Sequence, residues 1–262
     1  MFKDLKLHIR DGGFINTNIP AYTDGVLRTA LRRFLAFPSL ERQQYSQKGL
    51  SIAFDGYSYI GQKDSLNQYD KDLLHSFVLS NISREENFPQ AFQKYVKQEF
   101  LEQLVFIRAL EKKVLKILGF SESRAFYEEH SKHMVSSNFY PELDVAIQKI
   151  VPVDRLSFHT DVSLFSVFLF GLESGFVYEK PTGQIVLLDT IEEMVLFPGY
   201  FTELVTKGKI KALKHGVVFP GNRTEERFLF AFFSIPKSDA ILELSSFKGS
   251  GSEYYQHYLN QF

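Results

Sequence analysis

The sequence of 262 residues contains no cysteine. Disulfide bonds and thiolate metal sites are therefore excluded, and a bound metal would need histidine, carboxylate or tyrosine ligands. Such ligands suit borderline-hard ions such as Fe(II) or Zn(II) better than they suit soft ions.

Long apolar runs are also missing. No stretch approaches the roughly 20 consecutive apolar residues that a transmembrane helix needs. The beginning of the chain, MFKDLKLHIRDGG, has no apolar run of signal-peptide length. These observations predict a soluble, cytoplasmic protein.

The chain has no excess of charge of either sign. Its 30 basic and 31 acidic side chains give a net charge of -1, so no electrostatic argument favours nucleic acid or an anionic membrane surface as a partner. We expect a small-molecule substrate as the partner, and a monomer as the oligomeric state. An apolar content of 44% is typical of a globular protein, and the length suffices for one large domain with its own core.

Helical periodicity is confined to the first half of the chain. Residues 24–41 show helical spacing that stops before Pro38. A longer helix is predicted at about 89–118, where Pro89 suits the first turn and Gly119 suits a C-terminal cap. Its apolar residues step by three or four and form one stripe, which is typical of a helix that packs on a sheet.

Short β-prone runs separated by turn residues dominate from residue 136 onward. Their number and near-regular spacing favour a sandwich or barrel such as a jelly roll. We therefore predict a single α+β domain, 1–262, with a mainly β core. In this prediction a helical part, 1–135, packs on a jelly-roll core, 136–240.

The chemistry of the chain centres on the stretch HTDVS, which begins at His159. Alternate residues of a strand face the same side, so His159 and Asp161 can bind one ion together. His215, in the strand-like run KALKHGVVF, is the candidate third ligand. Two histidines and one carboxylate on one face of a metal form the triad of non-haem Fe(II) oxygenases. The pair alone is weak, because H-x-D also arises by chance and a solvated or capping pair remains open.

A second group of candidates could bind an anion. Arg227 precedes the apolar run of RFLFAFFSIP, where a guanidinium is costly unless it meets a negative charge. Arginine binds a carboxylate through two parallel hydrogen bonds. Asn138 and Tyr140, in SSNFYP, could add donors to the same anion, and Arg155 could meet an acidic substrate.

These motifs together resemble the isopenicillin N synthase-like branch of the 2-oxoglutarate- and Fe(II)-dependent dioxygenases. HTDVSLFSVFLFGLESGFVYEKPTGQIVLLD is similar to the stretch from the family's H-x-D through its G-L-x-V hairpin, and His215 follows at the distance that the family shows. NFYP matches N-Y-Y-P, and RFLFAFFSIP matches R-x-S-x-A-x-F-x-x-P. Nearer the N-terminus, GFINTNIP, FLAFPSLERQQY and DGYSYIG resemble further family motifs, so the likeness spans nearly the whole chain.

The resemblance implies a double-stranded β-helix, which is a jelly roll, with N-terminal helices packed on it. It implies Fe(II) held by His159, Asp161 and His215, with 2-oxoglutarate and O2 as co-substrates. Arg227 and Tyr140 would bind the far carboxylate of 2-oxoglutarate, and Asn138 is a further candidate for this site. The implied reaction is the hydroxylation of a small organic metabolite, with release of succinate and CO2.

One departure from the family pattern leaves alternatives open. Leu229 stands where the family has a serine that helps the arginine to hold the carboxylate. The alternatives are an oxidase that uses Fe(II) and O2 without an oxoacid, and an inactive jelly-roll binding protein. His130 and His133, in EHSKH, could share a metal on a helix, but without a third ligand nearby we expect them on a solvated helix face.

Overall fold

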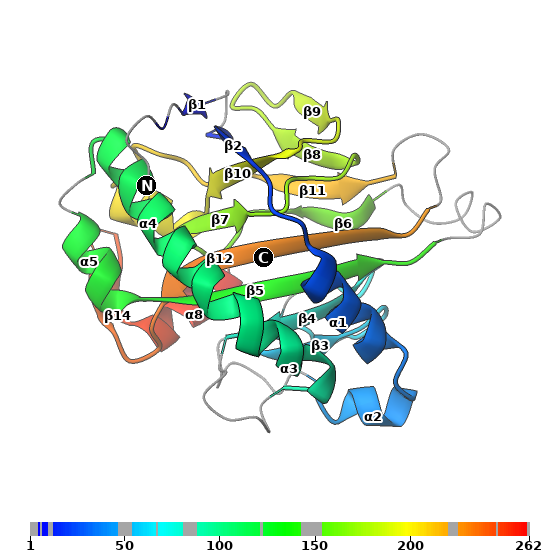
Figure 1. Cartoon of the computed structure of the whole chain (residues 1–262). Coiled ribbons are helices and arrows are strands. Elements are labelled where there is room, and N and C mark those ends of the chain that lie inside the picture. Colours follow the sequence, from blue (N-terminus) through cyan, green and yellow to red (C-terminus); the bar gives the residue numbers. More distant parts are fainter. Residues whose placement is uncertain are drawn as a thin grey trace.

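The computed structural model describes residues 5, 7–9, 13–46, 54–66, 68–80, 88–120, 123–142, 154–219, 225–244 and 246–260. Two antiparallel sheets, of eight and four described strands, enclose a cavity between them (Figure 1). This arrangement is the jelly roll that the sequence predicted. No helix within the described ranges is both long and apolar enough to cross a lipid bilayer.

The larger sheet contains eight strands and carries one wall of the cavity. Its two long central strands pair along ten residues, from Arg227 opposite Tyr140 to Pro236 opposite Ser131. In spatial order the strands are β1 (His8–Ile9), β2 (Ile15–Pro20), β10 (Glu193–Pro198), β7 (Phe165–Phe168), β12 (Arg227–Pro236), β5 (Ser131–Tyr140), β4 (His75–Leu79) and β3 (Gly56–Ser58).

The smaller sheet carries the opposite wall. Its strands, in spatial order, are β6 (Asp154–His159), β11 (His215–Val218), β8 (Phe176–Glu179) and β9 (Ile185–Leu188). A separate hairpin, β13 (Ile241–Glu243) with β14 (Lys248–Ser250), leads into the C-terminal helix α8 (Gly251–Leu259). The Ser250 hydroxyl accepts a hydrogen bond from the Glu253 amide, which fixes the start of this helix.

Helices cover the outer face of the larger sheet (Figure 1). The predicted helix at 89–118 is present as a continuous run of η3 (Gln90–Phe92), α3 (Gln93–Tyr95), the π-helical η4 (Val96–Phe100) and α4 (Leu101–Ile117). The predicted helix at 24–41 is present as α1 (Gly25–Leu35) and α2 (Ser39–Gln43), separated at Pro38. The remaining described helices are α5 (Ser123–His130) and α7 (Tyr200–Val205).

The N-terminal part is less helical than we predicted. Four strands, β1 to β4, come from this part and join the larger sheet. They are short, from two to six residues, and their side-chain pattern is too brief for strand periodicity to stand out. The β core also begins earlier than 136, since β5 starts at Ser131.

Successive side chains of β12 point to opposite faces of the larger sheet, so the strand contributes to both the hydrophobic core and the cavity wall. Phe228, Phe230 and Phe232 pack into the hydrophobic cluster that includes residues of α1 and α4. Leu229 and Ala231 face the other way and line the cavity, as the period of two in a strand requires.

The expectation for the EHSKH histidines was wrong for His133. This residue lies on β5, because the strand begins directly after the helix that ends at His130. Its Nε2 lies 2.9 Å from Glu111 Oε2, and the Tyr127 hydroxyl also donates to this carboxylate. The Ser234 hydroxyl donates to Glu111 Oε1 at 2.7 Å. His133 and Glu111 thus form a buried polar network between α4 and the sheet.

Candidate metal centre

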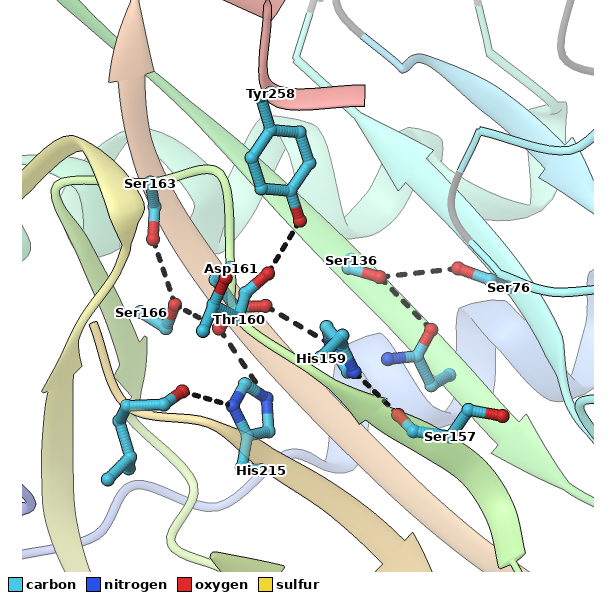
Figure 2. A network of polar contacts seen from close by, with 12 residues as sticks. Ser76, Ser136, Ser157, His159, Thr160, Asp161, Ser163, Ser166, His215 and Tyr258 are labelled. Atoms are coloured by element: carbon cyan, nitrogen blue, oxygen red, sulfur yellow. Dashed lines mark hydrogen bonds and ion pairs between the residues drawn. The ribbon is translucent and has the colours of Figure 1, made fainter. Parts of the chain in front are cut away.

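The structure brings His159, Asp161 and His215 together. One potential ligand atom from each lies within 4.8 Å of the others, and Figure 2 shows the three side chains directed toward one another. His159 ends β6 and His215 begins β11, and their Cα atoms are partners in the smaller sheet. We had expected Asp161 in the same strand as His159, and this was wrong. Strand β6 ends at His159, and Asp161 lies in the segment between β6 and β7.

Both imidazole rings are held in the tautomer that a metal needs. His159 Nδ1 lies 2.8 Å from the Ser157 carbonyl, and His215 Nδ1 lies 3.0 Å from the Leu213 carbonyl. Because a carbonyl only accepts, each Nδ1 carries the proton and donates it. In the neutral form of each ring Nε2 is then the unprotonated atom, and it lies on the side of Asp161, at 3.4 Å from Oδ1 for His159 and 3.6 Å from Oδ2 for His215.

The ionisation of the three residues is coupled. Burial opposes the charged form of His159, but the hydrogen bond and charge of Asp161 outweigh it and raise the pKa of this ring. Burial disfavours the ionised form of Asp161, but His215, His159 and a hydrogen bond from Ser166 outweigh it and lower the pKa of the carboxyl group. The Ser166 hydroxyl donates to Oδ2 at 2.5 Å (Figure 2). Burial lowers the pKa of His215 to about 4, so this ring is neutral near pH 7.

The segment that carries Asp161 is fixed by residues that the sequence analysis did not identify. Tyr258, on α8, donates from its hydroxyl to the Thr160 carbonyl at 2.5 Å (Figure 2), and Tyr254 donates to the Val162 carbonyl at 2.6 Å. The two tyrosines are four residues apart on one helix face, and this spacing was the signal available in the sequence. It did not say which segment the helix would contact.

Gly199 lets the chain pass close to the same segment. A Cβ atom at this position would lie 2.2 Å from the Ser163 carbonyl oxygen and 2.8 Å from the Asp161 carbonyl oxygen. Neither distance is possible for a real side chain, so the close approach requires glycine here.

The three residues border a cavity between the two sheets. Its walls are mostly apolar and include Leu229, Ala231 and Phe233 of β12. A second hollow lies next to it and shares His159 and Tyr258 with it. Tyr258 of α8 therefore lies at the junction of the two spaces.

A polar strip crosses the wall of the larger sheet. The Ser136 hydroxyl donates to Asn138 Oδ1 at 3.0 Å and lies 3.2 Å from the Ser76 hydroxyl. Figure 2 shows Ser76 and Ser136 in the same view as the three candidate ligands. Because the Asn138 oxygen accepts from Ser136, the amide nitrogen of Asn138 is left to donate elsewhere.

Arg227 and Tyr140 pair two residues farther along the sheet than Leu229 and Asn138. The Arg227 guanidinium lies 5.6 Å from the centre of the Tyr140 ring and donates from Nη2 to the Glu173 carbonyl at 2.9 Å. Arg227 Nε and Nη1 and the Tyr140 hydroxyl are buried without a hydrogen-bond partner among the described residues. Burial raises the pKa of Tyr140, so its hydroxyl stays protonated and can donate.

These donor sets fit a metal ion and an anion. Two imidazole nitrogens and one carboxylate form the facial set that binds Fe(II) and leaves coordination positions open. Three buried donors with no acceptor among the described residues, two of them on a guanidinium, fit a carboxylate. The same chain thus offers both groups of donors that a metal-chelating dicarboxylate would need.

Comparisons with known proteins agree with this assignment of the fold. A family model described as the 2OG-Fe(II) oxygenase superfamily matches residues 126–236. A bi-functional coumaroyl CoA and feruloyl CoA ortho-hydroxylase, Diox4 of Ruta graveolens, is 24% identical over 238 residues, which are 87% of this chain. They make up 63% of the relative, so the chain spans less than two thirds of its length.

Solved structures show the same fold. A full-length Neurospora crassa protein, crystallised in complex with alpha-KG, superposes with a TM-score of 0.74 at 19% identity, covering 95% of this chain and 86% of that one. JOX2, crystallised with 2OG, Fe and JA, gives a TM-score of 0.73 at 18% identity, covering 95% of this chain and 78% of that one.

Proposed function

We propose that the protein is an Fe(II)- and 2-oxoglutarate-dependent dioxygenase that hydroxylates a small organic metabolite, on the premise that residues 126–236 match the model of the 2OG-Fe(II) oxygenase superfamily. The observation that carries the proposal is the pairing of two donor sets. His159, Asp161 and His215 can hold a metal, and Arg227 with Tyr140 can hold a carboxylate.

In this proposal the three ligands would occupy one face of Fe(II). The Nδ1–H bonds to Ser157 and Leu213 keep both imidazoles oriented, and Ser166 keeps Asp161 in place. When bound together, iron, 2-oxoglutarate and O2 supply the oxidising power that converts a substrate C–H to C–OH while the oxoacid becomes succinate and CO2.

Arg227 and Tyr140 would orient the oxoacid by its far carboxylate. Arg227 has Nε and Nη1 to offer to the anion, and a guanidinium can bind a carboxylate through two of its nitrogens. The Asn138 amide, which lines the cavity, is proposed as a further contact. The apolar side chains Leu229, Ala231 and Phe233 would exclude water from the space between the two donor sets.

The remaining assignments are also proposals. We propose that the chain acts as one domain, that it works as a monomer in the cytoplasm, and that its partner is a small molecule and neither nucleic acid nor membrane. The cavity between the two sheets supports a small-molecule substrate, because it is concave and mostly apolar with a few polar groups, as ordinary ligand sites are.

One observation favours a second candidate function. Leu229 lines the cavity where the R-x-S pattern would place a hydroxyl. An oxidase that uses Fe(II) and O2 without an oxoacid would not need this hydroxyl. The two candidates differ in their products, because only the first releases succinate.

The test combines metal binding with product analysis. Wild-type protein loaded with Fe(II) should form succinate from 2-oxoglutarate, and faster in the presence of its substrate. His215→Ala should bind much less iron and form no succinate, whereas the control His130→Ala should match wild type. Equal iron content in wild type and His215→Ala would refute the metal assignment. Substrate-dependent O2 uptake without succinate would support the oxidase.

A further inference from the structure

Two buried arginines meet at one end of the jelly roll. Arg155 is the second residue of β6 in the smaller sheet, and Arg227 is the first residue of β12 in the larger sheet. The starts of β6 and β12 and the end of β5 lie on the right in Figure 1. Arg155 is 2% exposed and Arg227 is 4% exposed, which is rare for arginine unless a negative charge is near.

Backbone carbonyls and aromatic rings contact the two guanidinium groups. Arg155 donates from Nη2 to the Glu225 carbonyl at 2.9 Å and lies 4.2 Å from the centre of the Phe219 ring. Arg227 donates from Nη2 to the Glu173 carbonyl at 2.9 Å. A carbonyl or a ring orients a guanidinium but does not neutralise its charge. The Glu173 carboxylate is near enough to act favourably on both guanidinium groups, although burial outweighs its effect and the pKa of each arginine is lowered.

Tyr140 lies close enough to both guanidinium groups for each of them to lower its pKa against the effect of burial. Burial and the charge of Arg227 together lower the pKa of Arg155 to about 10. Two like charges in a buried site repel each other, and an anion placed between them would convert this repulsion into attraction. The donors of Arg227 and Tyr140 that have no partner among the described residues mark where such an anion would bind.

We propose that Arg155 is a second cationic residue of the oxoacid site. Its charge would strengthen binding of the far carboxylate, and it would compensate for the hydroxyl that is missing at Leu229. This inference rests on the proposed function, since it assumes that the anion is the far carboxylate of 2-oxoglutarate. Arg155 comes from the opposite sheet to Arg227, so the two charges would act on the carboxylate from different walls of the barrel.

The test compares two oxoacids that differ only in the far carboxylate. Binding of 2-oxoglutarate and of 2-oxopentanoate to the Fe(II) protein is measured by calorimetry under argon. Arg155→Met should weaken 2-oxoglutarate binding by about tenfold or more, which corresponds to about 1.4 kcal/mol or more. Binding of 2-oxopentanoate should stay within about twofold of wild type, because this ligand has no far carboxylate for Arg155 to attract.

Three further variants keep the result interpretable. Arg155→Lys retains the positive charge and should recover part of the affinity. Lys211→Met removes one positive charge from an exposed side chain paired with Glu203, and should bind both oxoacids like wild type. If Arg155→Met does not fold, Arg155→Gln replaces it, because its uncharged amide keeps a hydrogen-bond donor at this position.

Each outcome separates this proposal from the function on which it rests. If wild type prefers 2-oxoglutarate and the uncharged Arg155 variants show the same preference, the role of Arg155 is wrong and the oxoacid site stands. If wild type does not distinguish the two oxoacids, the proposed co-substrate is wrong, and the inference about Arg155 is overturned with it.

Discussion

The Tyr140 hydroxyl should oppose the stability of the protein without ligand and favour the binding of 2-oxoglutarate. The side chain is fully buried, and its hydroxyl has no hydrogen-bond partner in the described part of the chain. Tyr140→Phe removes this hydroxyl and keeps the ring that lies beside Arg227. The substitution should therefore change stability and affinity in opposite directions.

The magnitudes follow from the energies of hydrogen bonds. A buried polar group without a partner costs about 1–3 kcal/mol, so Tyr140→Phe should raise the free energy of unfolding by up to this amount. For a chain of this length, each kcal/mol corresponds to roughly 2–4 °C in Tm. A hydrogen bond to a charged group contributes about 1.5–3 kcal/mol, so 2-oxoglutarate should bind about ten- to a hundredfold more weakly.

Tyr255→Phe is the matched control. Tyr255 is as buried as Tyr140, but its hydroxyl donates to the Pro236 carbonyl. The control should therefore lose stability, because it leaves a buried carbonyl without this donor. It should bind 2-oxoglutarate like wild type.

The assay is thermal unfolding of the three proteins with and without 2-oxoglutarate, together with calorimetry of oxoacid binding under argon. Wild type should gain more Tm from saturating 2-oxoglutarate than Tyr140→Phe gains. If Tyr140→Phe binds the oxoacid like wild type, Tyr140 is only a core residue and the carboxylate site has been placed wrongly.

Three other substitutions test the remaining contacts of the site. Arg227→Leu should weaken 2-oxoglutarate binding by about 2–5 kcal/mol, as expected when a buried charge partner is truncated, and unchanged calorimetry would contradict the carboxylate site. Gly199→Ala should lower both Tm and Fe(II) affinity, because the added Cβ would lie 2.2 Å from the Ser163 carbonyl oxygen. Gly25→Ala is the control, because a Cβ there would have no atom within 4 Å. Tyr258→Phe removes the donor to the carbonyl that precedes Asp161, so Fe(II) should dissociate severalfold more readily in a chelator competition, and an unchanged rate would show that α8 does not position this ligand.

The candidate ligands could be found in the sequence because their signal is local. His159 and Asp161 are two residues apart, and His215 lies in a run with strand character. Arg227 was recognisable as a charged residue before an apolar strand, where burial is costly without an anion. The structure agrees for His159 and Arg227, since β6 ends at His159 and β12 begins at Arg227, whereas Asp161 lies beyond the end of β6.

Local sequence patterns were less informative where strands are short, or where pairing with a distant segment determines the secondary structure. The strands β1 to β4 join the larger sheet through pairing with distant segments, such as β4 with β5, and a run of two to six residues carries little periodicity of its own. His133 was expected on a solvated helix, yet the chain switches to β5 at Ser131 and buries it against Glu111.

Residue chemistry and spacing along single stretches of chain were enough to predict the fold class and the three candidate ligands, and to suggest the arginine and tyrosine of the proposed carboxylate site. Which distant groups support the candidate ligands became visible only in the folded protein. Gly199 and Tyr258 reach the segment of Asp161 from elements far away in the sequence, and their roles depend on close approach and hydrogen bonding. Such contacts form only when the two sheets and α8 pack together, so no local pattern records them.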